Sequence, residues 1–86
     1  MTINNEEDFI EIIKYKSFKK IKKFFKINKI NIEQLNYFEY TLYYLIKEGY
    51  SYDIIKFIIK QRHKSNKNLL IIQVLYYVRL NIIILG

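Results

Sequence analysis

Apolar residues recur every three to four positions through most of the chain, and lysines fill many of the positions between them. After Ser17, apolar side chains stand at positions 18, 21, 24 and 25, and lysines occupy the intervening positions. This spacing places one kind of side chain on each face of a helix, whereas a half-buried strand would alternate with a period of two. The pattern therefore predicts an all-α protein, although isoleucine-rich runs favour strands by propensity alone.

Capping residues indicate where several helices begin or end. Asn5 precedes three acidic residues and Ser17 precedes the lysine-rich segment, so each side chain can accept hydrogen bonds from free amides at a helix start. Gly49, the only internal glycine, predicts a helix end. Asn28 predicts another, because asparagine tolerates the left-handed conformation that follows many helices.

These signals predict five helices joined by short connections. The first helix begins after Asn5, the second covers 18–27 and the third covers 38–48. The fourth begins after a cap at Ser51 or Asp53, and the fifth covers 69–85. A loop at 29–36 and a turn at 63–68 connect them. The last segment is apolar almost all round, so either this chain or another has to cover it. No apolar run reaches the length of about 18 residues that a membrane span needs, and the acidic start differs from a signal peptide. The sequence therefore predicts a cytoplasmic protein without a membrane span.

The chain resembles itself at an offset of 33 to 34 residues. The matching segments are Leu42–Leu45 with Leu75–Val78 at an offset of 33, and Ile21–Phe25 with Ile55–Ile59 at 34. Phe9 lies 33 residues before Leu42, and one extra residue after Gly49 reconciles the two offsets. Self-similarity at this period indicates stacked two-helix units that use one another as core. One domain, 1–86, then divides into units at 6–37 and 38–68 and a truncated third unit at 69–86.

The unit around Gly49 resembles an ankyrin repeat. Leu42 matches the leucine of the family's Thr-Pro-Leu-His helix, Gly49 matches the glycine of its inter-helix turn, and Asp53–Ile59 resembles its second helix. In the first unit, Phe9 takes the place of the leucine and Lys16 takes the place of the glycine. The resemblance implies a stack of helical hairpins and a role as a protein-interaction adaptor.

The chain departs from the ankyrin pattern at positions that affect packing. It has no proline, and Leu45 and Ile46 stand where the family has paired alanines, which implies a wider spacing between helix layers. Most of the tyrosines at repeat-equivalent helix positions are expected to pack in the core or between repeats, with their hydroxyls reaching the surface: Tyr43, Tyr44, Tyr76 and Tyr77. Tyrosines near predicted turns are expected to be free to contact a partner: Tyr15, Tyr37, Tyr50 and Tyr52.

Lysine and arginine outnumber aspartate and glutamate by 15 to 8, and the excess lies in two blocks. Residues 14–29 carry eight lysines and no acid, and residues 60–68 carry four more cations. One interpretation is a solvated face enriched in lysine by codon usage. The other is a surface that binds a polyanion. The predicted RNA-binding residues are Lys19, Lys20, Lys22, Lys23, Lys26, Lys60, Arg62, Lys64 and Lys67.

The titratable residues give little support to catalysis. His63 is the only histidine, and it lies at the cationic end of a predicted helix, where contact with the helix dipole or with phosphate is expected. The consecutive acids Glu6, Glu7 and Asp8 point in different directions on a helix, which favours capping over metal binding. The chain has no cysteine and no glycine-rich phosphate loop. We therefore predict a non-enzymatic protein of a reducing compartment, with no catalytic residue, metal or cofactor.

Two binding functions remain. The first is a small structural subunit of a ribonucleoprotein such as the ribosome, whose lysines contact RNA phosphates and whose apolar last helix contacts protein. Its predicted protein-interface residues are Leu70, Val74, Tyr77, Ile82 and Ile83. The second is an ankyrin-like adaptor that binds protein alone. Membrane attachment through the basic segment 17–27 is disfavoured, because repeat equivalence places its apolar face in the core, and self-association through the last helix is a further alternative.

Overall fold

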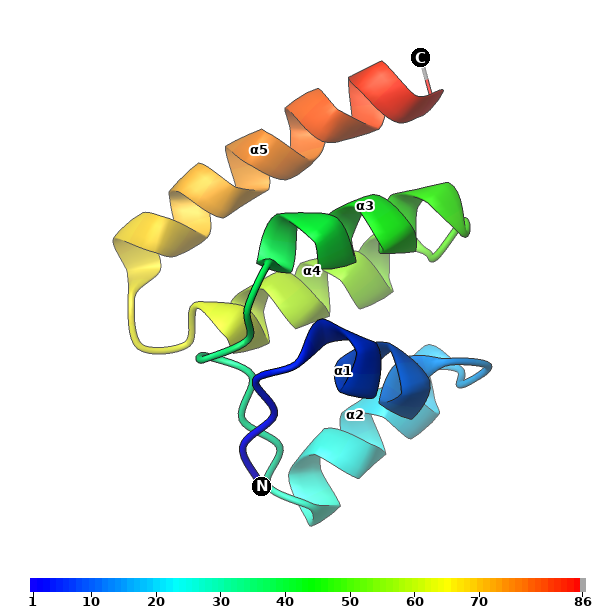
Figure 1. The fold of residues 1–86 in the computed structure, drawn as a ribbon, viewed down its shortest axis with the longest axis vertical. Coiled ribbons are helices and arrows are strands. Elements are labelled where there is room, and N and C mark those ends of the chain that lie inside the picture. The colour runs from blue at the N-terminus through cyan, green and yellow to red at the C-terminus, as the bar shows by residue number, and fades with distance from the viewer. Residues whose placement is uncertain (86) are drawn as a thin grey trace.

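The chain folds as two helical hairpins followed by one long helix (Figure 1). The computed structural model describes residues 1–85, and its helices are α1 (Glu6–Ile13), α2 (Phe18–Ile27), α3 (Phe38–Lys47), α4 (Tyr52–Arg62) and α5 (Lys67–Leu85). Within residues 1–85 there is no strand, and one isolated bridge joins Thr2 to Asn31. The predicted all-α class and its five helices are confirmed. The terminal Gly86 of the predicted third unit lies outside the described residues.

The hairpins are stacked on one another. α1 packs against α3, and α5 packs against both α3 and α4. Figure 1 shows α1 and α2 at one end, α3 and α4 in the middle, and α5 across the other end. α2 and α4, the second helices of the two hairpins, contact each other through phenylalanines. The ring centroids of Phe25 and Phe57 lie 5.2 Å apart in an edge-to-face contact. The middle hairpin is therefore covered on two sides, whereas α5 is covered on only one.

Buried positions recur with the period of the sequence repeat. Phe9 and Leu42, which are 33 residues apart, are both fully buried, and Ile21 and Ile55, which are 34 apart, are both 1% exposed. Each pair occupies the same place in successive hairpins. The stack therefore buries one apolar stripe from each helix of α1 to α4 in a shared core.

Side-chain caps start three of the helices where the sequence predicts them. The Asn5 side chain accepts hydrogen bonds from the amides of Glu7 and Asp8, at 2.8 and 3.2 Å. Ser17 caps α2, and Ser51 rather than Asp53 caps α4 by accepting from the Ile54 amide at 3.4 Å. These bonds satisfy amides that have no partner inside the helix, so they fix the start of each helix.

The turns within the two hairpins place a left-handed residue at equivalent positions. Gly49 has φ +76° after α3, as expected for the glycine of an inter-helix turn, and Tyr15 has φ +63° after α1. The assignment of the glycine place to Lys16 was therefore wrong by one residue. Tyr15 and Ser17 both match their counterparts at an offset of 34, so the extra residue of the second unit lies in the last turn of α3 and not after Gly49.

The connection between the hairpins is more ordered than its sequence indicates. Asn28 ends α2 as predicted, but its φ is −92°, and the left-handed residue is Lys29 at φ +48°. The amide of Ile3 donates to the Asn31 carbonyl at 2.8 Å, and the amide of Asn31 donates to the Met1 carbonyl at 2.8 Å. Ile32 is fully buried in this connection. The N-terminal segment and the loop thus close one end of the core.

α5 lies on the stack with one face. Leu70, Val74 and Tyr77 point toward the core, with Leu80 and Ile84 on the same stripe. By length and composition alone, Lys67–Ile84 is long and apolar enough to cross a membrane, with a mean hydropathy of 1.4. The expectation that no segment meets this length was therefore wrong. The finding is weak evidence for a span, because core helices of soluble proteins pass the same test.

Candidate polyanion-binding site

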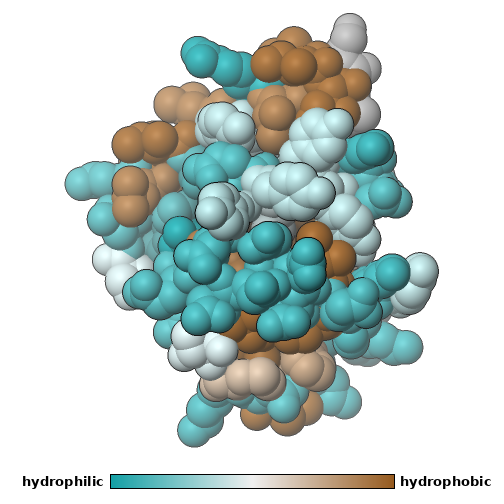
Figure 2. All heavy atoms as spheres, in the orientation of Figure 1, coloured by the Kyte–Doolittle hydropathy of each residue, from teal (hydrophilic) through white to brown (hydrophobic). Residues whose placement is uncertain are grey.

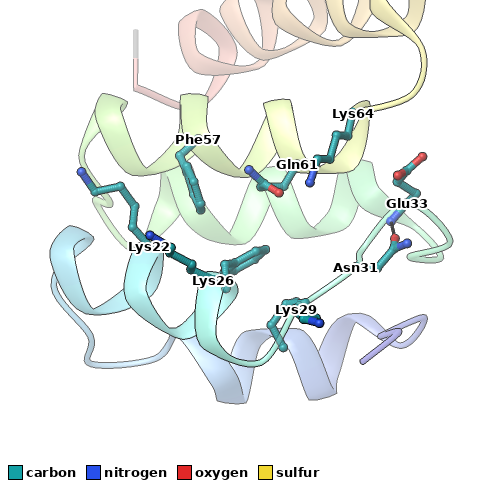
Figure 3. Close-up of a pocket in the computed structure, with 10 residues that line it drawn as sticks. Lys22, Lys26, Lys29, Asn31, Glu33, Phe57, Gln61 and Lys64 are labelled. Carbon is teal, nitrogen blue, oxygen red and sulfur yellow. Dashed lines mark hydrogen bonds between the residues drawn. The ribbon is translucent and has the colours of Figure 1, made fainter.

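A cleft between the C-terminal halves of α2 and α4 collects lysines from both basic blocks (Figure 3). Its volume is about 460 Å³. The residues that line it are Lys22, Phe25, Lys26, Lys29, Ile30, Asn31, Glu33, Phe57, Gln61 and Lys64. Because α2 and α4 are the second helices of successive hairpins, the stack brings residues 22–29 and 57–64 together although they are distant in the chain.

The amphipathic pattern of α2 positions the lysines at the rim of this cleft. Phe25 is buried and makes an edge-to-face contact with Phe57, which forms the apolar floor. Lys22 and Lys26 are exposed on the adjacent face of α2. The Lys22 ammonium also lies 4.4 Å from the centroid of the Phe18 ring, a cation–π distance. Packing of the phenylalanines therefore fixes where the charges of α2 stand.

Little negative charge opposes the four lysines of the cleft. Glu33 is the only acidic residue in the lining, and its amide donates to the Asn31 side chain at 2.8 Å, the contact drawn in Figure 3. The only ion pair among residues 1–85 joins Lys14 to Glu11 at 3.9 Å, outside the cleft. Clustered ammonium groups without carboxylate partners attract an anion with several charges, such as a run of phosphates.

The structure divides the nine predicted RNA-binding residues into three groups. Lys22, Lys26 and Lys64 line the cleft. Other exposed lysines do not line it: Lys19, Lys20, Lys23, Lys60 and Lys67. Arg62 turns inward instead, with its guanidinium 5.6 Å from the centroid of the Phe38 ring and an NH group donating to the Glu33 carbonyl. It supports the connection between the hairpins, whereas a residue that binds RNA phosphate is expected to point outward.

His63 is also directed into the protein. Its side chain is buried, and its Nε2 lies 3.1 Å from the Gln73 side-chain oxygen of α5. Burial lowers the pKa of His63 below its ordinary value, and the nearby Arg62 acts in the same direction, while the Gln73 hydrogen bond opposes them. The expected contact of His63 with phosphate is therefore wrong, and its role is to join the end of α4 to α5.

Lys29, Asn31 and Gln61 are cleft residues that the sequence did not single out. Lys29 belongs to the first basic block, so its charge was a usable signal. Asn31 and Gln61 are uncharged and join the cleft only through tertiary packing. Among the described residues no group of three or more histidines, aspartates or glutamates is placed to hold a metal ion.

A second cleft, of about 410 Å³, lies between the two hairpin turns. Lys14, Tyr15 and Lys16 line one side, and Tyr44 and Tyr50 lie on the other. Tyr15 is 92% exposed, as expected for a tyrosine near a turn. Tyr50 is half-buried instead, and burial together with the Tyr44 hydrogen bond raises its pKa to about 12. Tyr50 is therefore less free to contact a partner than Tyr15, although part of its surface lines this cleft.

The apolar contacts predicted for α5 lie on two different faces. Leu70, Val74 and Tyr77 pack on this chain's own core and are therefore unavailable to another protein. Ile82 and Ile83 are 65% and 72% exposed, as a protein-binding surface requires. Of the four repeat-equivalent tyrosines, Tyr77 is buried and Tyr44 is partly buried, whereas Tyr43 and Tyr76 are 43% and 39% exposed, so packing inside the stack holds for two of them and not for most. Tyr37 and Tyr52 are exposed as expected. Figure 2 shows hydrophobic side chains gathered at the end of the molecule formed by α5.

Comparison with family models, with curated proteins and with solved structures finds no match to this chain. The resemblance to ankyrin repeats therefore rests on the residues that carry it. Two surfaces of the molecule bear on its function, the basic cleft and the exposed side of α5.

Proposed function

We propose that the chain is a small, non-enzymatic binding subunit that docks on a ribonucleoprotein such as the ribosome. The observation that carries the proposal is the cleft between α2 and α4, where Lys22, Lys26, Lys29 and Lys64 face a shared space with one acidic residue. In this proposal the lysines contact RNA phosphates, and the exposed side of α5 contacts protein. The remaining lysines of α2 widen the positive field around the cleft.

RNA contact of this kind has a characteristic salt dependence. Each lysine that neutralises a phosphate releases a condensed counterion, so the logarithm of the affinity falls linearly with the logarithm of the salt concentration. The slope changes by about 0.7 per phosphate contact for a single strand. A lysine that contacts phosphate carries no information on base identity, so its removal weakens binding to all RNA sequences alike.

Titration of a fluorescent RNA with the purified chain tests the proposal. The double variant Lys22→Gln with Lys26→Gln is expected to bind about tenfold or more weakly and to reduce the salt slope by about 1.4. The control is Lys47→Gln with Lys56→Gln, which removes the same charge from exposed positions outside the cleft. Equal loss in both variants would show that only net charge matters, and absence of RNA binding would reject the proposal.

Sedimentation of a cell lysate tests the host assembly. The chain is expected to run with heavy particles, to leave them at high salt, and to be released by ribonuclease. Migration as a free small protein under all conditions would contradict docking on a ribonucleoprotein.

A protein-interaction adaptor is the second candidate, and the matched hairpins favour it. The equivalent left-handed residues Tyr15 and Gly49 and the equivalent caps Ser17 and Ser51 are what a repeat protein is expected to have. Repeat stacks commonly offer an extended surface to another protein. In this case the chain stays with its partner after ribonuclease treatment and at moderate salt, and the cleft variants leave the complex intact.

A further inference from the structure

The side of α5 that points away from the core is an apolar surface with little charge. We call it the outer face of α5, and it consists of Leu69, Ile71, Ile72, Leu75, Tyr76, Val78, Arg79, Ile82 and Ile83. Its large apolar side chains are between 39% and 72% exposed. A monomeric soluble protein rarely exposes a continuous apolar patch of this kind without a partner for it.

The total surface of the molecule indicates how much is left uncovered. The accessible surface is 6021 Å² for a chain of 10.6 kDa. The scaling of folded monomers gives about 5,500 Å² for this mass, so the excess is about 500 Å². A standard protein interface takes about 800 Å² from each partner. The excess over a typical folded monomer is therefore about three-fifths of what one partner gives to a standard interface, which suits a small and reversible dimer interface.

Two hollows beside this helix are suited to receive side chains. Ile72, Leu75, Tyr76 and Arg79 surround a hollow of about 240 Å³ on the outer face itself. A second hollow of about 340 Å³ lies between α3 and α5, and its lining is Tyr37, Glu39, Tyr40, Tyr43, Tyr76 and Leu80. Tyr76 belongs to both hollows, so they form one surface. Tyrosine and arginine are among the residues enriched at the centres of protein interfaces.

The charges of this surface are complementary to each other. Arg79 is the only charged residue of the first hollow, and Glu39 is the only one of the second. They form no ion pair with each other, because the only pair within residues 1–85 is Lys14 with Glu11. A surface that carries one cation, one anion and apolar residues between them can match a second copy of itself across a two-fold axis, which pairs each group with the opposite one.

We propose that the outer face of α5 binds the same face of a second copy of this chain. The two α5 helices run antiparallel, and Arg79 of each copy meets Glu39 of the other. An antiparallel arrangement separates Lys67 at the start of each α5, and Lys64 just before it, from the same residues of the other copy, whereas a parallel one would place them side by side. The pairing adds a helix on the uncovered side of α5, as α3 already has on both of its sides. The protein that contacts the outer face of α5 is then a second copy of the chain. This dimer does not depend on RNA contact.

A lipid bilayer is the other environment that an exposed apolar helix fits, and the structure disfavours it. Insertion of all of α5 would remove Leu70, Val74 and Tyr77 from the core and break the His63–Gln73 contact. Shallow insertion of the outer face would bury the Arg79 guanidinium at the middle of the apolar surface, away from the polar boundary. A second copy offers that guanidinium a carboxylate instead.

Sedimentation equilibrium of the full chain over a wide concentration range tests the proposal. The wild type is expected to show a reversible monomer–dimer equilibrium, and Leu75→Gln or Ile72→Gln is expected to weaken it about tenfold or more. The matched control is Ile27→Gln on α2, since Ile27 is 66% exposed and Leu75 is 65% exposed. Circular dichroism confirms that each variant keeps its helices. A wild type that stays monomeric, or a control that dissociates like the test variants, overturns the proposal.

A charge swap tests the pairing in detail. Arg79→Glu and Glu39→Arg are each expected to weaken the dimer, and the double variant is expected to recover most of the loss, because the two ion pairs re-form with reversed sign. Salt is expected to strengthen the dimer, since each copy carries a net charge of +7. No recovery in the double variant overturns the stated pairing. A monomer that binds vesicles of phosphatidylcholine and phosphatidylserine through Leu75 overturns the dimer in favour of a membrane.

Discussion

His63 shows how tertiary contacts change the role of a residue. Its sequence neighbours are Arg62 and Lys64, a setting typical of anion contact. In the folded chain its ring is buried, packs edge to face with Phe38 at 5.9 Å, and contacts Gln73. The local sequence pattern does not identify Gln73 as the partner of His63, because Gln73 lies ten residues away on another helix. His63, the residue that the sequence favours for anion contact, therefore holds α5 in place.

Stability is expected to fall as the pH drops below about 6.5, the ordinary pKa of histidine. Burial lowers the His63 pKa in the folded state, so the unfolded chain binds the proton more readily. The stabilisation is therefore complete above the unfolded value and is lost as the pH falls toward the folded one, by at most about 1.4 kcal/mol per pH unit for one proton. Urea unfolding at pH 7.5 and pH 5.5 measures the loss.

The variant His63→Gln serves as the control for this titration, because it has no titrating ring while its amide can still bond to Gln73. The difference between the variant and the wild type isolates His63 from the eight acids. If both proteins lose the same free energy of unfolding between the two pH values, His63 is not the group responsible.

At the scale of helices and turns, the inter-helix turn of the first hairpin holds a tyrosine where the second has glycine. Tyr15 at φ +63° carries a strain of about 1–2 kcal/mol that glycine does not. Gly49 at φ +76° has nothing within 4 Å of the position of an added Cβ, so an alanine there meets conformational strain only. Replacing Tyr15 by glycine therefore relieves backbone strain in the first turn, whereas replacing Gly49 by alanine introduces strain at the equivalent position of the second.

Tyr15→Gly is expected to raise the free energy of unfolding by about 0.5–1 kcal/mol, because relief of strain exceeds the added flexibility of the unfolded chain. Gly49→Ala is expected to lower it by about 1 kcal/mol. Lys16→Gly is the control, since the left-handed residue is Tyr15 and not its neighbour, and it is expected to destabilise. Denaturant unfolding measures all three, and stabilisation by Lys16→Gly instead would place the turn one residue later.

Much of the element plan follows from the sequence because its causes are local. Caps at Asn5, Ser17 and Ser51 act within three residues, and the apolar stripes of α2 and α4 repeat at helical spacing. The turn residue of the first hairpin was misplaced because Tyr15 is not a residue that favours positive φ. The contact of the N-terminal segment with Asn31 was missed because it joins two segments without periodicity.

The candidate site was only partly predictable, because two blocks of charge do not specify which lysines meet. The cleft depends on Phe25 packing against Phe57, which brings Lys64 toward α2. The inward face of α5 was not predictable from periodicity, since apolar residues surround this helix and the stack alone selects Leu70, Val74 and Tyr77. Sequence patterns therefore located the charged and apolar segments, and tertiary packing decided which side chains remained free.

For the whole molecule, the balance of charge is unfavourable to a compact state. The net charge is +7 on 86 residues, and residues 1–85 contain only one ion pair, which is exposed and 3.9 Å long. Repulsion among the lysines thus opposes folding without much compensation from salt bridges. Screening by salt removes more repulsion than attraction in such a protein.

The melting temperature is therefore expected to rise when sodium chloride is increased from low to moderate concentration, by about 4–8 °C for each kcal/mol of repulsion that is screened. Thermal unfolding followed by circular dichroism measures it, at a protein concentration low enough that association makes no contribution. The double variant Lys22→Glu with Lys26→Glu changes the charge by two units at each position, which lowers the net charge from +7 to +3. Its melting temperature is expected to rise less with salt than that of the wild type.

A melting temperature that falls with salt would mean that attractive ion pairs outweigh the repulsion. An equal rise in the variant would mean that the lysines of the cleft are too far apart to repel one another, which would also weaken the argument that they hold one polyanion.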